Sequence, residues 1–325
     1  MRFTLGISGD LLTSEGNPCF GNKPLESLIK EKQIRVEWLD PSIQILSEKE
    51  TSKYDAILLN SPKLNKDSIN PKNNKLKIVS RFGVGYDSVD LEVLKKNKII
   101  LTNTPNAVRR PVAVASLTMI LSLSGKLIIK DNLVREGRWN ERTDHMGVGL
   151  TNKTLGLIGF GGIGREFVKI SKDLFNKVIC YDPFVDKDEM KNLQVDKVDF
   201  NEIAKLSDFL VILCDLNEKT KGMINSSFLG KMKKSSYLIN LSRGPVVNEN
   251  DLIISLKQKK IAGAGLDVMT NEPIDENNEL LNMKNTILTP HSLCWTDECF
   301  NSIATEAISS ILNYFNKKYI INRVI

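Results

Sequence analysis

Histidine is rare in this chain, so proton transfer by an imidazole has few candidates. Only two histidines occur among 325 residues, His145 and His291. His291 follows a short apolar run that has the length of a buried strand, whereas His145 lies in a polar stretch and is expected to face solvent. An imidazole titrates near neutral pH and can both donate and accept a proton there. His291 is therefore the first candidate for acid–base chemistry.

A glycine-rich segment predicts a dinucleotide site. Gly159, Gly161 and Gly164 form a G-x-G-x-x-G sequence between a strand-like run that begins at Thr154 and residues with helical spacing. The first glycine permits a tight turn, the second lets the backbone approach a pyrophosphate, and the third lets the helix pack on the strand. The start of that helix offers free amide donors and a positive dipole to the phosphates.

An acidic residue favours one nicotinamide cofactor over the other. Asp182 ends the apolar run 178–181, at the separation expected for a ribose-binding carboxylate. It would accept hydrogen bonds from the adenosine ribose and repel a 2′-phosphate, so the sequence predicts NAD rather than NADP. The alternative for Asp182 is a cap or turn residue before Pro183.

Redox chemistry on a hydroxy or keto acid needs three groups besides a nicotinamide. These are a proton donor or acceptor at the reacting oxygen, a cation for the carboxylate, and a group that tunes the donor. Histidine suits the first role, and arginine, with its planar fork of donors, suits the second.

The elements that must position these residues alternate between strand and helix almost from end to end. This pattern is typical of parallel sheets covered by helices on both faces, so the predicted fold class is α/β. Strands are expected at 3–7, 35–39, 55–59, 77–79 and 99–101, and in a second series from 154 through 178–181, 209–213, 237–240, 262–267 and 286–288. A final helix is expected at about 296–315, and a loop with a short helix at 63–75.

The segment 107–123 predicts a buried helix, because it is apolar nearly all round. Pro111 fits a first helical turn, and Gly125 fits the end. The helix either packs between two domains or two subunits or is simply a core helix. Arg109 and Arg110 precede Pro111, and they either reach an acidic substrate or phosphate or mark the surface start of the helix.

Composition excludes several classes of protein. The length allows two domains, and 41% hydrophobic with 26% charged residues is typical of a folded, soluble chain. No apolar stretch approaches the roughly 18 residues of a membrane span and no signal peptide begins the chain, so the cytoplasm is the expected location. The net charge of +6 is spread along the chain, which argues against nucleic-acid binding.

The five cysteines include no C-x-x-C pair, which agrees with a reducing compartment. His291 and Cys294 have no second cluster of ligands nearby, so no metal site is expected.

Several segments resemble, in order and spacing, the D-isomer-specific 2-hydroxyacid dehydrogenase family, which includes phosphoglycerate dehydrogenases and glyoxylate reductases. They are NLSRGPVVN at 240–248, AGLDVMTNEP at 264–273 and TPH at 289–291, with the glycine motif, GVGYDSVD at 83–90 and NTPN at 103–106. The resemblance covers nearly the whole chain. Departures are VAV at 112–114, CDLN at 214–217 and SLCW at 292–295.

The resemblance implies a role for each of three residues. Arg243 would bind the carboxylate of a small 2-oxo or D-2-hydroxy acid and help to polarise its carbonyl. Glu272 would pair with His291 and stabilise its protonated form. His291 would protonate the carbonyl oxygen during reduction and deprotonate the hydroxyl during oxidation, as hydride moves from or to NAD.

The resemblance also implies the residues that contact each ligand. Substrate contacts are expected from Phe82, Gly83, Val84, Gly85, Arg243, His291 and Trp295. Cofactor contacts are expected from Val84, Gly159, Gly161, Gly162, Ile163, Gly164, Asp182, Cys214, Leu241, Ser242, Arg243, Asp267, His291, Ser292 and Cys294. Asp267 would accept a hydrogen bond from the carboxamide, and Trp295 either shapes the substrate pocket or packs against the last helix.

The implied architecture has two doubly wound parallel-sheet domains. A flavodoxin-like substrate-binding domain would consist of residues 1–102 and 291–325, with a NAD-binding Rossmann domain, residues 103–290, inserted into it. Family members are usually dimers built around the nucleotide domain, so a homodimer is expected. The alternative function is an NAD(H)-sensing, corepressor-like binding protein on the same fold.

Overall fold

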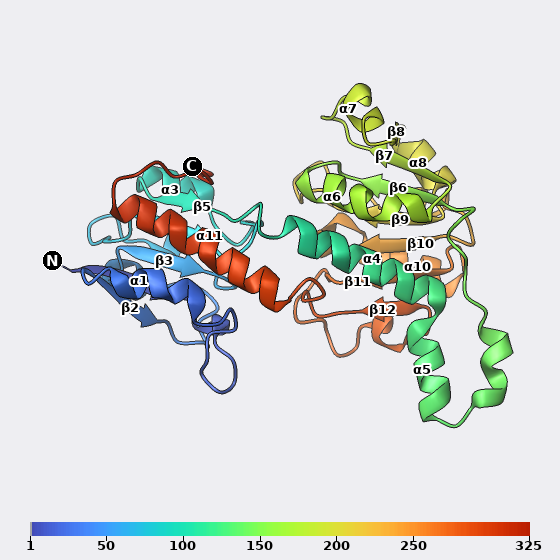
Figure 1. The fold of residues 1–325 in the computed structure, drawn as a ribbon, viewed down its shortest axis with the longest axis horizontal. Coiled ribbons are helices and arrows are strands. Elements are labelled where there is room, and N and C mark those ends of the chain that lie inside the picture. Colours follow the sequence, from blue (N-terminus) through green and yellow to red (C-terminus); the bar gives the residue numbers. More distant parts are fainter. Residues whose placement is uncertain (1) are drawn as a thin grey trace. The chain divides into compact units, whose positions relative to one another are not determined.

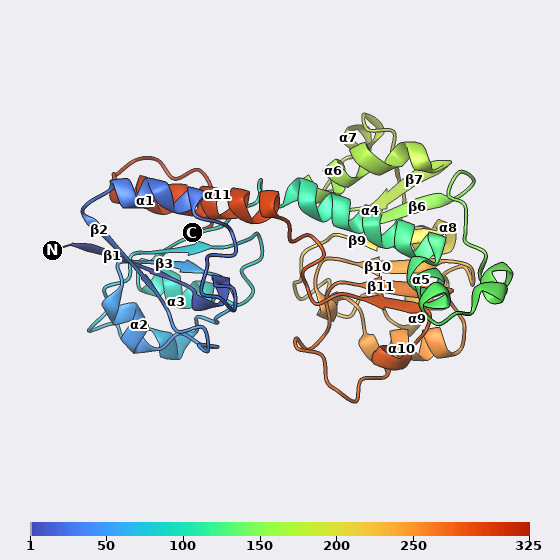
Figure 2. The same cartoon turned by 60° about the horizontal axis from the view of Figure 1, so that its bottom comes forward.

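The computed structural model describes residues 2–325 and divides into two compact units (Figures 1 and 2). One unit consists of Met1–Val108 and Trp295–Ile325, and the other of Arg109–Cys294. The chain therefore leaves the first unit once and returns to it for the last helix.

The first unit is built on a five-stranded parallel sheet in the order β2-β1-β3-β4-β5, which is the flavodoxin-like order. Its strands are β1 (Phe3–Ile7), β2 (Ile34–Trp38), β3 (Ala56–Leu59), β4 (Ile78–Arg81) and β5 (Ile100–Thr102). Its helices are α1 (Glu26–Lys30), α2 (Glu48–Lys53), α3 (Leu91–Lys96) and α11 (Asp297–Phe315), with 3-10 turns η1 (Gly9–Leu11), η2 (Lys23–Leu25) and η3 (Lys66–Ser68).

The second unit contains a seven-stranded parallel sheet in the order β12-β11-β10-β9-β6-β7-β8. This is the Rossmann order with one more strand at the β12 edge. Its strands are β6 (Thr154–Ile158), β7 (Lys177–Tyr181), β8 (Asp196–Lys197), β9 (Phe209–Ile212), β10 (Tyr237–Asn240), β11 (Gly263–Leu266) and β12 (Thr286–Leu288). Its helices are α4 (Arg109–Gly125), α5 (Leu127–Arg135), α6 (Gly162–Ser171), α7 (Lys187–Lys191), α8 (Phe200–Leu206), α9 (Ser226–Leu229) and α10 (Glu249–Lys257), with 3-10 segments η4 (Trp139–His145), η5 (Lys172–Leu174), η6 (Gly244–Val246) and η7 (Glu279–Asn282).

The central strands are buried on both faces, as expected for a parallel sheet between two helical layers. Every residue of β3, β9, β10 and β11 is buried. In β11 a Cβ on Gly265 would lie 2.3 Å from Cγ of Met119, so a glycine at this position lets α4 pack directly on the sheet. α4 is therefore a core helix of its unit, although Val114 and Leu121 on its other face are 45% and 47% exposed.

The structure departs from the sequence-based expectation at a few elements. The helix expected at 107–123 runs from Arg109 to Gly125, and α5 and β8 were not predicted. His145 is half-buried at the end of η4 rather than in an open loop. Within residues 2–325 no single helix is long and apolar enough to cross a membrane, and α4 with α5 passes that test only as a pair bent by 58°.

Candidate active site

Most of the predicted site residues lie at one edge of the seven-stranded sheet. The carboxyl ends of parallel strands meet at the same edge, where open α/β sheets bind their ligands. Gly159, Gly161, Gly162, Ile163 and Gly164 follow β6, Asp182 follows β7, Cys214 follows β9, Leu241, Ser242 and Arg243 follow β10, Asp267 follows β11, and His291, Ser292 and Cys294 follow β12. Glu272 lies in the connection between β11 and β12.

The glycine motif fits the backbone requirements of a pyrophosphate site. Gly159 has a φ of 101°, and a Cβ there would lie 2.8 Å from the backbone nitrogen of Cys214. A Cβ on Gly164 would lie 2.5 Å from the carbonyl oxygen of Gly159, so α6 packs tightly on the turn. Apart from Gly161 itself and its chain neighbours, no atom of residues 2–325 lies within 4 Å of the position of a Cβ on Gly161, which leaves room for a ligand beside the backbone. These residues therefore fit NAD.

Asp182 is fixed next to the same turn. One carboxylate oxygen accepts a hydrogen bond of 2.8 Å from the backbone N–H of Phe160, and the other accepts one of 2.8 Å from Phe184. Asp182 thus has the turn-forming role considered as the alternative. Each oxygen keeps a further lone pair, so the same geometry leaves it able to accept hydrogen bonds from ribose hydroxyls.

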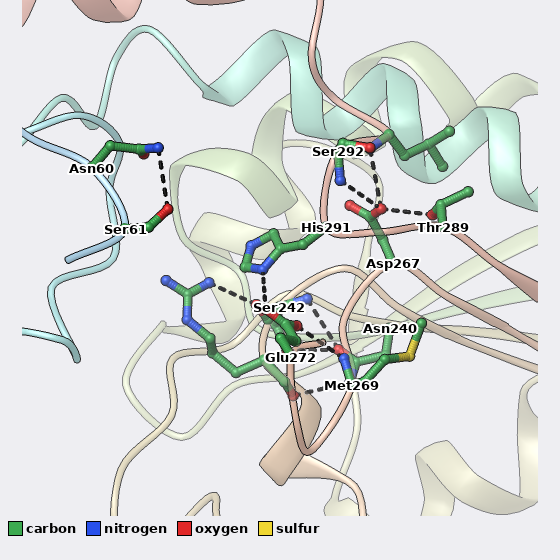
Figure 3. Close-up of polar contacts among 12 residues, drawn as sticks. Asn60, Ser61, Asn240, Ser242, Asp267, Met269, Glu272, Thr289, His291 and Ser292 are labelled. Atoms are coloured by element: carbon green, nitrogen blue, oxygen red, sulfur yellow. Dashed lines mark hydrogen bonds and ion pairs between the residues drawn. The ribbon is translucent and has the colours of Figure 1, made fainter. Parts of the chain in front are cut away.

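His291 and Glu272 form a hydrogen-bonded pair (Figure 3). Nδ1 of His291 lies 2.8 Å from Oε2 of Glu272, and Oε1 of Glu272 accepts a hydrogen bond of 3.0 Å from the backbone N–H of Met269. The two side chains remain 44% and 40% exposed. With Nδ1 engaged, Nε2 is the imidazole nitrogen that is left to exchange a proton with a ligand.

The charge state of Glu272 suits this pairing. Burial by itself would raise the pKa of Glu272, but the hydrogen bond and charge of His291, the Met269 N–H and the charge of Arg243 outweigh it, and the pKa lies below its usual value. Glu272 is therefore ionised at neutral pH. His291 and Arg243 thus both act electrostatically on Glu272.

A buried asparagine organises the loop that carries Arg243. The side-chain oxygen of Asn240 accepts hydrogen bonds from the backbone N–H of Ser242 at 3.0 Å and from its hydroxyl at 2.8 Å. The amide of Asn240 donates to the carbonyl oxygen of Arg243 at 3.0 Å, and Nη1 of Arg243 donates to the carbonyl oxygen of Ser242 at 2.8 Å. Asn240 stands in the NLSRG segment, but its role in this loop was not predicted from the sequence.

Asp267 anchors the turn that carries His291. Its Oδ1 accepts hydrogen bonds from the hydroxyl of Thr289 at 2.6 Å and from the backbone N–H groups of Ser292 and Leu293 at 3.0 and 3.1 Å (Figure 3). Burial raises the pKa of Asp267, and these hydrogen bonds only partly offset the rise. Asp267 was predicted from the sequence to contact the cofactor, and its hydrogen bonds to this turn were not predicted.

Cys214, the cysteine predicted to line the cofactor, has a thiol that is not ionised at physiological pH. Burial, reinforced by the negative charge of Asp215, raises the pKa of Cys214 to about 12, so its thiol is neutral at physiological pH. Among residues 2–325, no group of three His, Cys, Asp or Glu side chains is placed to hold a metal ion.

The first unit carries the remaining predicted residues. Gly83, Val84 and Gly85 follow β4, and Gly83 has a φ of 124° and donates its N–H to the Thr104 hydroxyl at 3.0 Å. The side chain of Phe82 is buried, with its ring centroid 5.2 Å from that of Phe300. The backbone N–H of Phe82 donates to the carbonyl oxygen of Leu59 at 2.8 Å, and its carbonyl oxygen accepts a hydrogen bond of 2.6 Å from Nη1 of Arg81.

Trp295 in the first unit packs against the last helix, which is one of its two expected roles. It is 53% exposed, yet its ring centroid lies 4.9 Å from that of Phe300 on α11. It packs against the last helix with one side and leaves the other free.

A polar group at the ends of β1 and β3 was missed from the sequence. The amide of Asn60 and the backbone N–H of Ser61 donate to Oδ2 of Asp10, at 2.7 and 3.0 Å. The amide of Asn60 also donates to the hydroxyl of Ser61 at 3.3 Å (Figure 3). Asn60 directly follows β3, and only this position at a strand end could have drawn attention to it.

Comparison with known proteins identifies the family. Residues 117–292 match the family model described as the NAD binding domain of D-isomer specific 2-hydroxyacid dehydrogenases. A glyoxylate reductase of Thermococcus litoralis is 34% identical over 294 residues, which are 87% of this chain and 88% of the relative. A D-3-phosphoglycerate dehydrogenase of Archaeoglobus fulgidus is 34% identical over 82% of this chain, which spans only 50% of that longer protein.

A solved structure agrees with this. The D-lactate dehydrogenase of Aquifex aeolicus, complexed with NAD and lactic acid, has a TM-score of 0.83 and 26% identity over 96% of each chain. The fold and the glycine turn define an NAD-dependent oxidoreductase with two α/β units. The chain belongs to the D-isomer specific 2-hydroxyacid dehydrogenase family, and its cofactor is NAD.

Proposed function

We propose that this chain interconverts a small 2-oxo acid and the corresponding D-2-hydroxy acid, with His291, Glu272 and Arg243 as its reaction centre. The observation that carries the proposal is the 2.8 Å contact between Nδ1 of His291 and Glu272 at the sheet edge that also holds the glycine turn. It orients an imidazole and leaves the other nitrogen for the substrate.

Each of the three side chains has one task. The cofactor, when bound, would supply the hydride as NADH for reduction and accept it as NAD⁺ for oxidation. Nε2 of His291 donates a proton to the carbonyl oxygen during reduction and takes it back during oxidation. The carboxylate of Glu272 stabilises the imidazolium, and the guanidinium of Arg243 binds the substrate carboxylate and polarises the neighbouring carbonyl.

We propose the remaining contacts with substrate and cofactor from the positions of the residues in the two units. The backbone of Phe82, Gly83, Val84 and Gly85 contacts the substrate carboxylate, and Trp295 limits the size of the substrate side chain. We assign substrate binding to the unit Met1–Val108 with Trp295–Ile325 and NAD binding to Arg109–Cys294. Asp182 binds the ribose, and Cys214, Leu241, Ser242, Asp267, Ser292 and Cys294 line the cofactor.

The test is NADH oxidation, followed by absorbance, against glyoxylate, hydroxypyruvate, pyruvate, 2-oxoglutarate and branched 2-oxo acids. NADPH is used in parallel. Turnover of one acid with NADH is expected and would identify the substrate class. NADH binding without turnover of any 2-oxo acid would contradict the proposal and favour an NAD(H)-sensing protein.

We also propose a homodimer in the cytoplasm. Large apolar side chains of α4, α5 and the segment after α5 are exposed, which fits a surface covered by a second copy. All five cysteines are free thiols, which fits a reducing compartment.

A further inference from the structure

Arg109 lies across the first turn of the helix that follows the glycine motif. It is the first residue of α4, and its side chain crosses Gly162, the first residue of α6. A Cβ on Gly162 would lie 2.5 Å from Nε of Arg109 and 3.1 Å from its Cδ and Cζ. The arginine therefore occupies the space that a side chain at Gly162 would fill. Both residues belong to the unit Arg109–Cys294.

Arg109 forms no ion pair within residues 2–325, in contrast to the neighbouring arginines. Arg110 pairs with Glu166 at 2.9 Å, and Arg165 pairs with Glu189 at 2.5 Å. Among residues 2–325, the guanidinium of Arg109 has no carboxylate or other hydrogen-bonding partner. It is exposed at the same turn that the cofactor approaches.

The space at this turn suits an anion. The first N–H groups of a helix have no partner within the helix, and those of α6 begin at Gly162, next to the open position at Gly161. An anion here meets amide donors, the positive end of the helix dipole and a free cation. In a dinucleotide site of this fold, the anion at this position is the pyrophosphate.

We propose that Arg109 is a further cofactor-binding residue, which pairs with the pyrophosphate of NAD from a helix outside the glycine motif. Gly162 is part of the same arrangement, because its lack of a side chain lets the guanidinium reach across the turn. The proposal requires NAD binding but not the roles of His291, Glu272 or Arg243. It therefore stands or falls separately from the reaction proposed above.

The test measures ligand binding by calorimetry, without substrate or turnover. Arg109→Met keeps most of the side-chain length and removes the charge, and Arg110→Met is the matched control. The ligands are NADH and ADP, which carry a pyrophosphate, and adenosine, which carries none. Arg109→Met is expected to lower the affinities for NADH and ADP by about tenfold, which is the effect of losing one hydrogen bond to a charged group. The affinity for adenosine is expected to stay unchanged. Arg110→Met is expected to leave all three affinities unchanged.

Two further variants separate binding from packing. Arg109→Lys keeps a cation and is expected to recover part of the ADP affinity. Gly162→Ala displaces the guanidinium, so on its own it should lower the affinity for ADP. Combined with Arg109→Met, it should lower that affinity little further. Equal losses for ADP and adenosine in Arg109→Met, no rescue by lysine, or equal effects of the two arginine variants would overturn the assignment.

Discussion

At the scale of single residues, His291 adopts a backbone conformation that most side chains avoid. Its φ is 53°, in the left-handed region where His and Asn are more frequent than other non-glycine residues. Alanine at this position would combine loss of the imidazole with backbone strain. Asparagine also lacks the imidazole but tolerates the same backbone conformation. His291→Asn therefore tests the loss of the imidazole without added backbone strain.

His291→Asn is therefore expected to lower kcat by at least about a hundredfold, the usual contribution of general acid–base catalysis, and to leave the Kd for NADH near that of the wild type. Steady-state rates with the 2-oxo acid that the panel identifies, and fluorescence titration with NADH, measure the two effects. His145→Asn is the matched control, because it replaces the other histidine, which belongs to η4 and does not follow a strand of the sheet. Unchanged turnover in His291→Asn would remove the imidazole from the mechanism.

Glu272 is expected to set the pH dependence of the reaction. Because its pKa lies below the usual carboxyl value, Glu272 stays charged as the pH falls, and its contribution to stability is lost only when the pH drops through that lowered value. Reduction needs a protonated imidazole, which the charge of Glu272 stabilises. Glu272→Gln should thus move the pH at which the reductase rate falls by half to lower pH.

The measurement is kcat/KM for the 2-oxo acid across the pH range. Glu276→Gln serves as the control, because it neutralises an exposed carboxylate on the same loop. A profile that stays in place for Glu272→Gln would mean that the pair has no influence on proton transfer.

At the scale of elements, the strands were predictable because burial dictates them. The central strands β3, β9 and β11 are continuous apolar runs, and the predicted strands end within about a residue or two of expectation. The last helix was predictable as well, because Thr296 caps α11 by accepting a hydrogen bond from Cys299 N–H at 3.1 Å. β8 has only two residues, which is too short to produce a pattern, and α5 begins after Lys126, whose φ of 53° breaks the helical run.

The polar side chains that hold the loops of the site by hydrogen bonds were harder to predict. Arg243, Glu272 and His291 could be proposed from the sequence because they stand in known motifs with chemistry suited to the reaction. Asn240 and Asp267 make hydrogen bonds to backbone groups of loops, and which backbone groups a side chain reaches depends on the folded path of the loop. Residue type and spacing do not contain that information.

The turn held by Asp267 should be rigid only as long as its three hydrogen bonds persist. Asp267→Ala leaves the N–H groups of Ser292 and Leu293 without their acceptor, at a cost of about 1–3 kcal/mol for each group that stays buried. We expect a lower Tm, faster hydrogen exchange in residues 289–294 and a lower kcat. Thr289→Val removes one of the three hydrogen bonds and should have a smaller effect.

Asp267→Asn is the informative comparison, because its amide oxygen can still accept from the turn. It should keep the exchange protection of residues 289–294 close to that of the wild type. Slow exchange in Asp267→Ala would show that the turn is held by other contacts.

At the scale of the whole molecule, the two units have separate cores, and they differ in which apolar side chains are exposed to solvent. In the unit Arg109–Cys294, the short segment 127–146 exposes Leu127, Ile128, Val134, Trp139 and Met146 by 51–73% each. Large apolar side chains this close in sequence and this exposed are typical of a surface that another chain covers. This observation supports the proposed homodimer.

The dimer can be tested by measuring the mass in solution with light scattering after gel filtration. The wild type is expected at twice the chain mass of 36.5 kDa, and Ile128→Asp combined with Trp139→Asp is expected at the mass of one chain, because charges on an apolar interface oppose its burial. Ile29→Asp is the control, since Ile29 is 74% exposed on α1 of the other unit and should not change the mass. A wild type with the mass of a single chain would show that segment 127–146 is exposed for another reason, and the catalytic proposal would be unaffected because its residues lie within one chain.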